Sequence, residues 1–117
     1  MSRTTVSPDM VDDGLKKRSK TITLNQPIAS TIPLLLDAEY AFTIKSVVVK
    51  TSSGSITYSL TVEGGAAHAN YTSKVIDTDK DIYTADQAVA LGESVELVLA
   101  SPSSPGFVTI QINWEAD

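Results

Sequence analysis

The sequence contains no cysteine among its 117 residues. This absence excludes a disulfide framework and any metal site built on thiolates. It does not fix the compartment, because a reducing cytosol suits such a chain and so does a particle that is assembled there and later released. A chain of this length is expected to form one domain that buries a hydrophobic core without covalent staples.

Long apolar segments are also missing from the sequence. No run approaches the roughly 20 apolar residues that a helix needs to cross a bilayer. The first residues lack the apolar stretch of a secretory signal. We therefore expect no membrane partner and a protein that is made and assembled inside a cell.

Basic charge is scarce beyond the first 20 residues. The net charge is -5, yet residues 1–20 hold five basic and three acidic residues, whereas residues 21–117 hold four basic and eleven acidic ones. Because contacts to phosphate require clustered Lys and Arg, the acidic body argues against nucleic acid as a partner. A polar basic segment ahead of an acidic body is typical of a segment that orders on another surface.

Catalytic signatures are lacking too. The sole histidine, His68, lies in a small-residue loop with only Glu63 as a nearby acid, and we interpret it as a solvated loop residue. No serine has the G-x-S-x-G context of a hydrolase nucleophile. We therefore expect no catalytic residue, no cofactor and no enzymatic activity.

One acidic motif raises the question of a cation. It consists of Asp77, Asp79 and Asp81. Alternating carboxylates open a helical calcium loop, but Ile82 and Ala88 stand where that loop needs Gly and Glu. Lys80 between the acids would repel a cation. We expect a solvated acidic loop and leave cation binding by the three carboxylates open.

Aromatic residues make up only 6% of the chain. Trp114 shares the alternation of Ile110 and Ile112, so we expect it in the core. Tyr71 and Tyr83 are better candidates for exposed contacts. Exposed aromatic side chains around a groove would favour a carbohydrate- or receptor-binding module over a purely structural role.

What the sequence does contain is apolar residues that recur at every second position, the pattern of a strand with one buried face. The positions expected to face inward are Ile22, Leu24, Phe42, Ile44, Ile56, Tyr58, Leu60, Val62, Val95, Leu97, Leu99, Val108, Ile110, Ile112 and Trp114. Turn signals separate the segments, and none shows a helical period over three turns. The presence of Pro33 indicates that the apolar run 31–36 is an edge strand.

These patterns predict an all-β fold: a single antiparallel β-sandwich, jelly-roll-like, with seven or eight strands. We expect residues 1–20 to form an extended N-terminal arm and residues 21–117 the sandwich domain. The last strand is expected inside a sheet. Because exposed strand edges must be covered, the apolar edge 31–36 predicts a homo-oligomer.

The arm carries the predicted partner-binding residues. Its apolar members, suited to shallow pockets, are Val6, Met10, Val11 and Leu15, and its basic cluster is Lys16, Lys17, Arg18 and Lys20. A compact basic cluster suits an acidic protein surface through complementary charge. The alternative is a flexible tail whose lysines only keep the chain soluble.

Two stretches carry a resemblance to a known class of proteins. They are AEYAFTIKSVVVKTSSGSITYSLTVEGG and VALGESVELVLASPSSPGFVTIQINW. Together with the segment between them they resemble the small β-sandwich virion proteins of tailed bacteriophages, over residues 21–114. The shared motifs are hairpin patterns and bring no catalytic residue.

The resemblance implies a structural protein of the virion, assembled in the host cytoplasm. Its expected role is capsid decoration or cement, with head-fibre, tail and baseplate pieces as alternatives. Its expected partners are the major capsid protein or other virion proteins, and the habit of the family points to a trimer. A carbohydrate- or receptor-binding module stays the second hypothesis.

Overall fold

The computed structural model describes residues 17–117, and within them the chain forms nine strands and one short 3-10 helix. The elements in chain order are β1 (Lys17–Asn25), β2 (Ser30–Leu35), β3 (Phe42–Thr51), β4 (Ser55–Val62), β5 (Gly65–Ala66), η2 (Ala69–Tyr71), β6 (Lys74–Ile76), β7 (Asp81–Val89), β8 (Val95–Ser103) and β9 (Phe107–Ala116).

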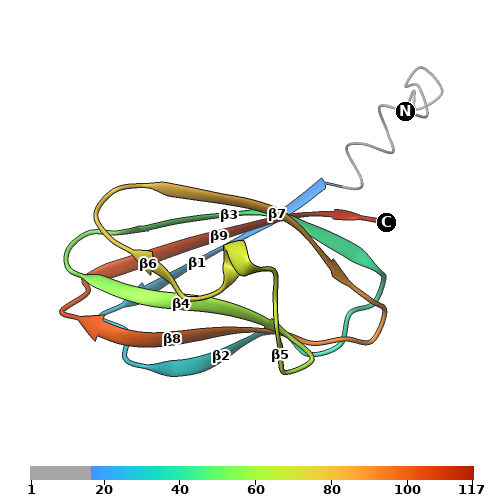
Figure 1. The fold of residues 1–117 in the computed structure, drawn as a ribbon, viewed down its shortest axis with the longest axis horizontal. Coiled ribbons are helices and arrows are strands. Elements are labelled where there is room, and N and C mark those ends of the chain that lie inside the picture. The colour runs from blue at the N-terminus through green and yellow to red at the C-terminus, as the bar shows by residue number, and fades with distance from the viewer. Residues whose placement is uncertain (1–16) are drawn as a thin grey trace, which may run out of the picture.

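The strands form two antiparallel sheets that face each other (Figure 1). One sheet has the order β1-β9-β3-β7, and the other has the order β2-β8-β4-β5, with β6 also pairing with β4. Without the two-residue β5, this is the strand order of an eight-stranded jelly roll. The predicted all-β sandwich is confirmed, and the ninth strand is the short β5 in a segment expected to be a loop.

The core lies between the sheets and follows the alternation seen in the sequence. In β4, for example, Ile56, Tyr58 and Leu60 are fully buried while the residues between them face outward. All fifteen positions expected to face inward are buried or half-buried; the half-buried ones are Ile22, Leu24, Val62 and Trp114. Burial of these apolar side chains is the main stabilising contribution to such a fold.

The position of each strand within its sheet agrees with two expectations. β9 lies between β1 and β3, so the last strand is internal as predicted. β2 pairs only with β8 and is an edge strand, with a register shift between Pro33 and Leu35. This position tolerates proline because an edge strand makes fewer ladder hydrogen bonds than an internal strand does.

The sandwich begins earlier in the chain than expected. β1 starts at Lys17, where it pairs with Glu115, and its pairing with β9 continues without interruption to Asn25. Lys17, Arg18 and Lys20 are therefore part of the sheet. The other predicted partner-binding residues, Val6, Met10, Val11, Leu15 and Lys16, lie outside the described residues.

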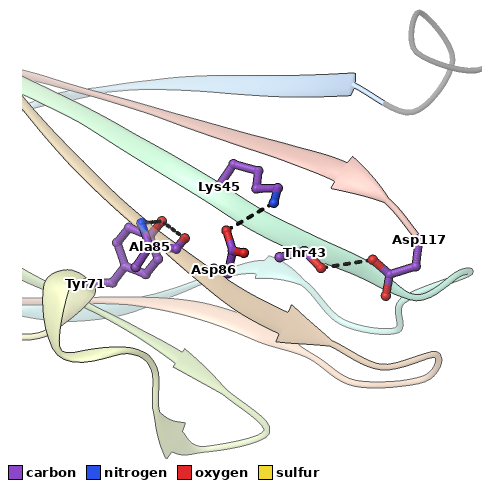
Figure 2. A network of polar contacts seen from close by, with 6 residues as sticks. All are labelled: Thr43, Lys45, Tyr71, Ala85, Asp86 and Asp117. Carbon is purple, nitrogen blue, oxygen red and sulfur yellow. Dashed lines mark hydrogen bonds and ion pairs between the residues drawn. The ribbon is translucent and has the colours of Figure 1, made fainter.

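The loops of the sandwich gather at its two ends. At one end lie the start of β1, the 36–41 loop, the 90–94 turn and the C-terminus (Figure 1). Asp117 is tied to β3 there, since Thr43 Oγ1 donates to Asp117 Oδ1 at 2.9 Å (Figure 2). The turns 26–29, 52–54 and 104–106 lie at the opposite end. No helix within residues 17–117 has the length and apolarity to cross a membrane.

Candidate functional site

A pocket of about 290 Å³ opens between the sheets at the end where β1 begins. Its lining residues are Lys20, Leu34, Leu35, Asp37, Glu39, Tyr40, Phe42, Ile44, Val95, Ile112 and Trp114. We call it the aromatic pocket. Its floor is apolar, its wall carries three aromatic rings and its polar groups are few, which is the usual composition of a ligand-binding cleft.

The pocket exists because the inward face of β1 changes character along the strand. Its inward positions run from Leu24 and Ile22 to Lys20, which lies opposite Ile112 of β9. A lysine does not close the core as an isoleucine would. Instead, Lys20 Nζ reaches across to β2 and donates to the carbonyl oxygen of Leu34 at 3.2 Å.

Three aromatic side chains form one wall of the pocket. The ring of Phe42 lies 5.9 Å from that of Tyr40 and 5.9 Å from that of Trp114, with interplanar angles of 62° and 48°. Trp114 Nε1 donates to the Tyr40 hydroxyl at 3.4 Å. Phe42 is buried, Trp114 is half-buried and Tyr40 is 44% exposed. The wall therefore offers apolar ring surface to whatever enters.

Two carboxylates stand at the rim of the pocket. Asp37 and Glu39 are both exposed, and within residues 17–117 no hydrogen bond or ion pair engages either carboxylate. Their loop is held on both sides by backbone hydrogen bonds. Ala38 N donates to Glu93 O at 3.0 Å, Gly92 N donates to Ala38 O at 2.8 Å, and Asp117 N donates to Ala41 O at 3.0 Å. The rim is thus positioned before any ligand arrives.

The described part of the predicted basic cluster borders this pocket. Arg18 lies opposite Trp114 and Lys17 opposite Glu115, while Lys20 lines the pocket itself. All three side chains are exposed, and the Arg18 guanidinium donates to the carbonyl oxygen of Lys17 at 2.9 Å. The sequence predicts these residues as part of a partner-binding surface, and it did not place them beside an aromatic pocket.

Tyr71 is not an exposed contact residue, so that expectation is wrong. It is fully buried, and its hydroxyl donates to Ala85 O and accepts from Ala85 N, the latter at 2.9 Å (Figure 2). Burial raises the pKa of Tyr71. The residue ends η2, where no alternation indicates which side chains turn inward.

Tyr83 is also not an exposed platform. It sits at an inward position of β7 and is half-buried, with its ring 5.9 Å from that of Tyr58. Burial raises the pKa of Tyr83, and the nearby Asp81 and Asp77 raise it further. The aromatic residue that is exposed in the pocket is Tyr40, which sequence reasoning missed. Its spacing from Phe42 and Ile44 was the available signal.

The single histidine has a structural role in its loop. His68 precedes η2, and its Nδ1 accepts a hydrogen bond from Asn70 N at 3.0 Å. Its own backbone N–H donates to Gln87 Oε1 at 2.7 Å. This local pairing is the capping chemistry of a short helical turn.

The acidic motif forms a turn before β7. Asp77 Oδ1 accepts a hydrogen bond from Asp79 N at 3.0 Å, an arrangement in which an aspartate closes its own turn. In the part of the chain from 17 onward, no three His, Asp or Glu side chains are grouped in a way that would hold a metal ion.

The comparisons with known proteins show a similarity of this chain in fold alone. No protein-family model matches the sequence, and no curated protein matches it either. A chain in the capsid structure of Helicobacter pylori bacteriophage KHP30 is similar, with a TM-score of 0.52 and 9% identity over 86% of this chain and 87% of that chain.

Two further solved structures are similar over most of this chain. One is the GH26-CBM35 β-(1,4)-mannanase of Podospora anserina, with a TM-score of 0.53 and 9% identity; the match covers 87% of this chain and 28% of that chain. The other is infectious bursal disease virus, Gx strain, with a TM-score of 0.48 and 12% identity over 86% of this chain and 34% of that chain. The chain is therefore a β-sandwich module whose fold neighbours include a chain in a phage capsid structure.

Proposed function

We propose that this protein is a non-enzymatic structural component of a tailed-phage virion, a capsid decoration or cement protein anchored through its N-terminal residues. The observation that carries the proposal is the fold likeness to a chain in the KHP30 capsid structure, which spans nearly the whole length of both chains. The hairpin patterns of residues 38–65 and 89–114 agree with it. Its partners are then the major capsid protein or other virion proteins.

The charge distribution supports an attachment end. Lys17, Arg18 and Lys20 lie at the start of β1, whereas residues 21–117 carry four basic and eleven acidic side chains. A basic strip on an otherwise acidic body orients the molecule toward an acidic shell and speeds encounter with it. Because the chain enters the sheet at Lys17, residues 1–16 and the basic strip act together in this proposal.

The test is co-sedimentation with cognate particles that lack this protein. The full chain is expected to sediment with the particles, and a chain without residues 2–16 is expected to stay in the supernatant. The deletion stops before Lys17 because β1 begins there. Its melting temperature should change little, since the buried core lies within the remaining residues.

A charge-matched control separates the effect of the basic strip on attachment from the effect of net charge. Replacing Lys17, Arg18 and Lys20 by Gln should weaken attachment, most visibly as salt rises, because exposed charges are screened over about 8–10 Å at physiological ionic strength. Replacing Lys50, Lys74 and Lys80 by Gln changes the net charge equally and should leave attachment intact. If the truncated chain decorates particles fully, the anchor assignment is wrong and attachment lies on the sandwich.

A further inference from the structure

We propose that the aromatic pocket binds one neutral pyranose ring of a glycan. In this assignment Trp114 and Tyr40 contact the apolar face of the sugar, and the carboxylates of Asp37 and Glu39 accept hydrogen bonds from its hydroxyls. The proposal goes beyond attachment to a particle and rests on side chains that the attachment proposal does not require.

The aromatic wall provides the apolar contacts for a sugar ring. A pyranose carries C–H groups on its faces, and these pack against aromatic rings whose surface is accessible from the pocket. Tyr40 is 44% exposed, and Trp114 is half-buried against Phe42. Tyr and Trp suit such a site because each combines a large apolar ring with a polar atom. Below the rings, the floor of Ile44, Val95 and Ile112 excludes water from the contact.

The rim of the pocket provides hydrogen-bond acceptors for the sugar hydroxyls. Asp37 and Glu39 make no hydrogen bond or ion pair with any residue from 17 to 117. An ionised carboxylate only accepts hydrogen bonds, and those it accepts from hydroxyls are short and strong. A ligand rich in hydroxyl donors therefore fits the rim better than an apolar side chain of a second copy does.

The charge of the rim selects against acidic sugars. Two carboxylates face one ammonium group, and that group already donates to the carbonyl oxygen of Leu34. A uronic or sialic acid would place a third carboxylate beside those of Asp37 and Glu39. Like charges at close range disfavour binding. The ring is thus a neutral hexose or N-acetylhexosamine.

The size of the pocket matches one ring. Its volume of about 290 Å³ lies at the lower end of the range for ligand pockets. Backbone hydrogen bonds hold the 36–41 loop to the 90–94 turn and to Asp117, so little ordering is required on binding. A ligand of about a dozen heavy atoms in such a site should bind in the millimolar range.

The chain provides its own probe, because Trp114 is the only tryptophan. The experiment titrates the full chain with methyl glycosides of glucose, galactose, mannose and N-acetylglucosamine, and with glucuronate and N-acetylneuraminate, while following tryptophan emission. At least one neutral sugar should give a saturable change, and neither acidic sugar should.

Three variants localise the effect. Tyr40→Ala should weaken binding by about tenfold, the scale of one lost aromatic contact. Tyr40→Phe keeps the ring and should bind nearly as well as the parent chain. Phe107→Ala is the matched control, because Phe107 is an exposed aromatic residue (57% exposed) outside the pocket lining. It should leave the titration unchanged, and circular dichroism should show that all three variants are folded.

Several results would overturn the assignment. One is the lack of any saturable change with all four neutral glycosides at millimolar concentration. Another is an unchanged titration in Tyr40→Ala, and a third is equal binding of the acidic sugars. An emission change that depends on protein concentration and on no sugar would mean that a second copy occupies the pocket. Particle attachment is measured separately by sedimentation, so failure of either proposal leaves the other to be tested on its own.

Discussion

At the scale of single residues, two buried tyrosines differ in the hydrogen bonding of their hydroxyl groups. Both Tyr58 and Tyr71 are fully buried. The Tyr71 hydroxyl is paired twice with the backbone of Ala85, at the point where the register between β3 and β7 shifts and Ala85 has no partner on β3. The Tyr58 hydroxyl has no hydrogen-bond partner among residues 17–117.

The same chemical change should therefore have different effects on stability at these two positions. Tyr71→Phe leaves two backbone groups of Ala85 unsatisfied and should cost about 1–3 kcal/mol of unfolding free energy. Tyr58→Phe removes a buried polar atom that has no partner and should be neutral or stabilising. Denaturant titration of both variants measures the difference. A comparable loss in Tyr58→Phe would show that its hydroxyl is hydrogen-bonded in solution.

Ionisation of the buried tyrosines makes stability depend on pH on the alkaline side. Burial raises the pKa of Tyr58, and the nearby Tyr83 and Tyr71 raise it further. In the unfolded chain this group titrates near its ordinary pKa of 10.0. The folded state therefore retains a proton that the unfolded state releases, and the contribution of Tyr58 is complete below that pH and is lost as the pH rises above it.

The unfolding free energy of the parent chain should accordingly fall with pH above about 10, with a steeper slope than that of Tyr58→Phe. Denaturant titrations at a series of alkaline pH values give both slopes. Tyr71 and Tyr83 remain in the variant and keep part of the dependence, since burial also raises their pKa values. Parallel slopes in the two chains would contradict the assignment to Tyr58.

At the scale of elements, two turns at the end opposite the aromatic pocket pack against each other. Gly54, in the turn between β3 and β4, has a φ of +66°, and a Cβ atom built there would lie 2.2 Å from Ser104 O. Gly106 N donates to Ser53 O at 3.0 Å, which joins the two turns directly. The close approach of the two backbones explains why this turn needs glycine.

Gly64 provides a matched control for this packing. It also has a positive φ, +78°, but nothing lies within 4 Å of a Cβ atom built there. Gly64→Ala should cost about 1–2 kcal/mol, the penalty for a left-handed L-residue. Gly54→Ala adds a steric clash to the same penalty and should cost clearly more. Equal losses in thermal or denaturant unfolding would mean that the two turns do not touch in solution.

At the scale of the whole molecule, the part of the sandwich formed by residues 17–117 has open sheet edges. β1 and β2 are the edges on the side bridged by Lys20 and Leu34, and β7 ends the first sheet on the other side. Ile28 and Leu36, which flank β2 in the sequence, are 73% and 77% exposed. Exposed edges with apolar flanks are surfaces that natural sheets cover.

We predict that the full chain is a homo-oligomer that uses the β2 edge, with a trimer expected from the virion proteins it resembles. Replacing Ile28 and Leu36 by Lys should shift the molecule toward the monomer in light scattering. Ile82→Lys is the control, because Ile82 is 58% exposed but lies on the outward face of β7. A monomeric parent chain at tens of micromolar would contradict the prediction.

The sequence by itself determined which side chains face the core of this protein. Alternation is a local property, because successive side chains of a strand point to opposite faces wherever the strand lies. Ile56, Leu60 and Leu97 could therefore be assigned to the core before any pairing was known. The edge position of β2 also followed from a local feature, the missing N–H of Pro33.

Only the tertiary structure decided what depends on contacts between distant parts of the chain. Tyr71 is buried and its hydroxyl is paired with the backbone of Ala85, and nothing in the sequence around Tyr71 indicates either. Lys17, Arg18 and Lys20 belong to the sheet because they pair with residues of β9 that lie between 92 and 98 positions later in the chain. The aromatic pocket joins Lys20, Tyr40 and Trp114 from three separate segments. Strand pairing and sheet closure bring such residues together, and local periodicity carries no information about either.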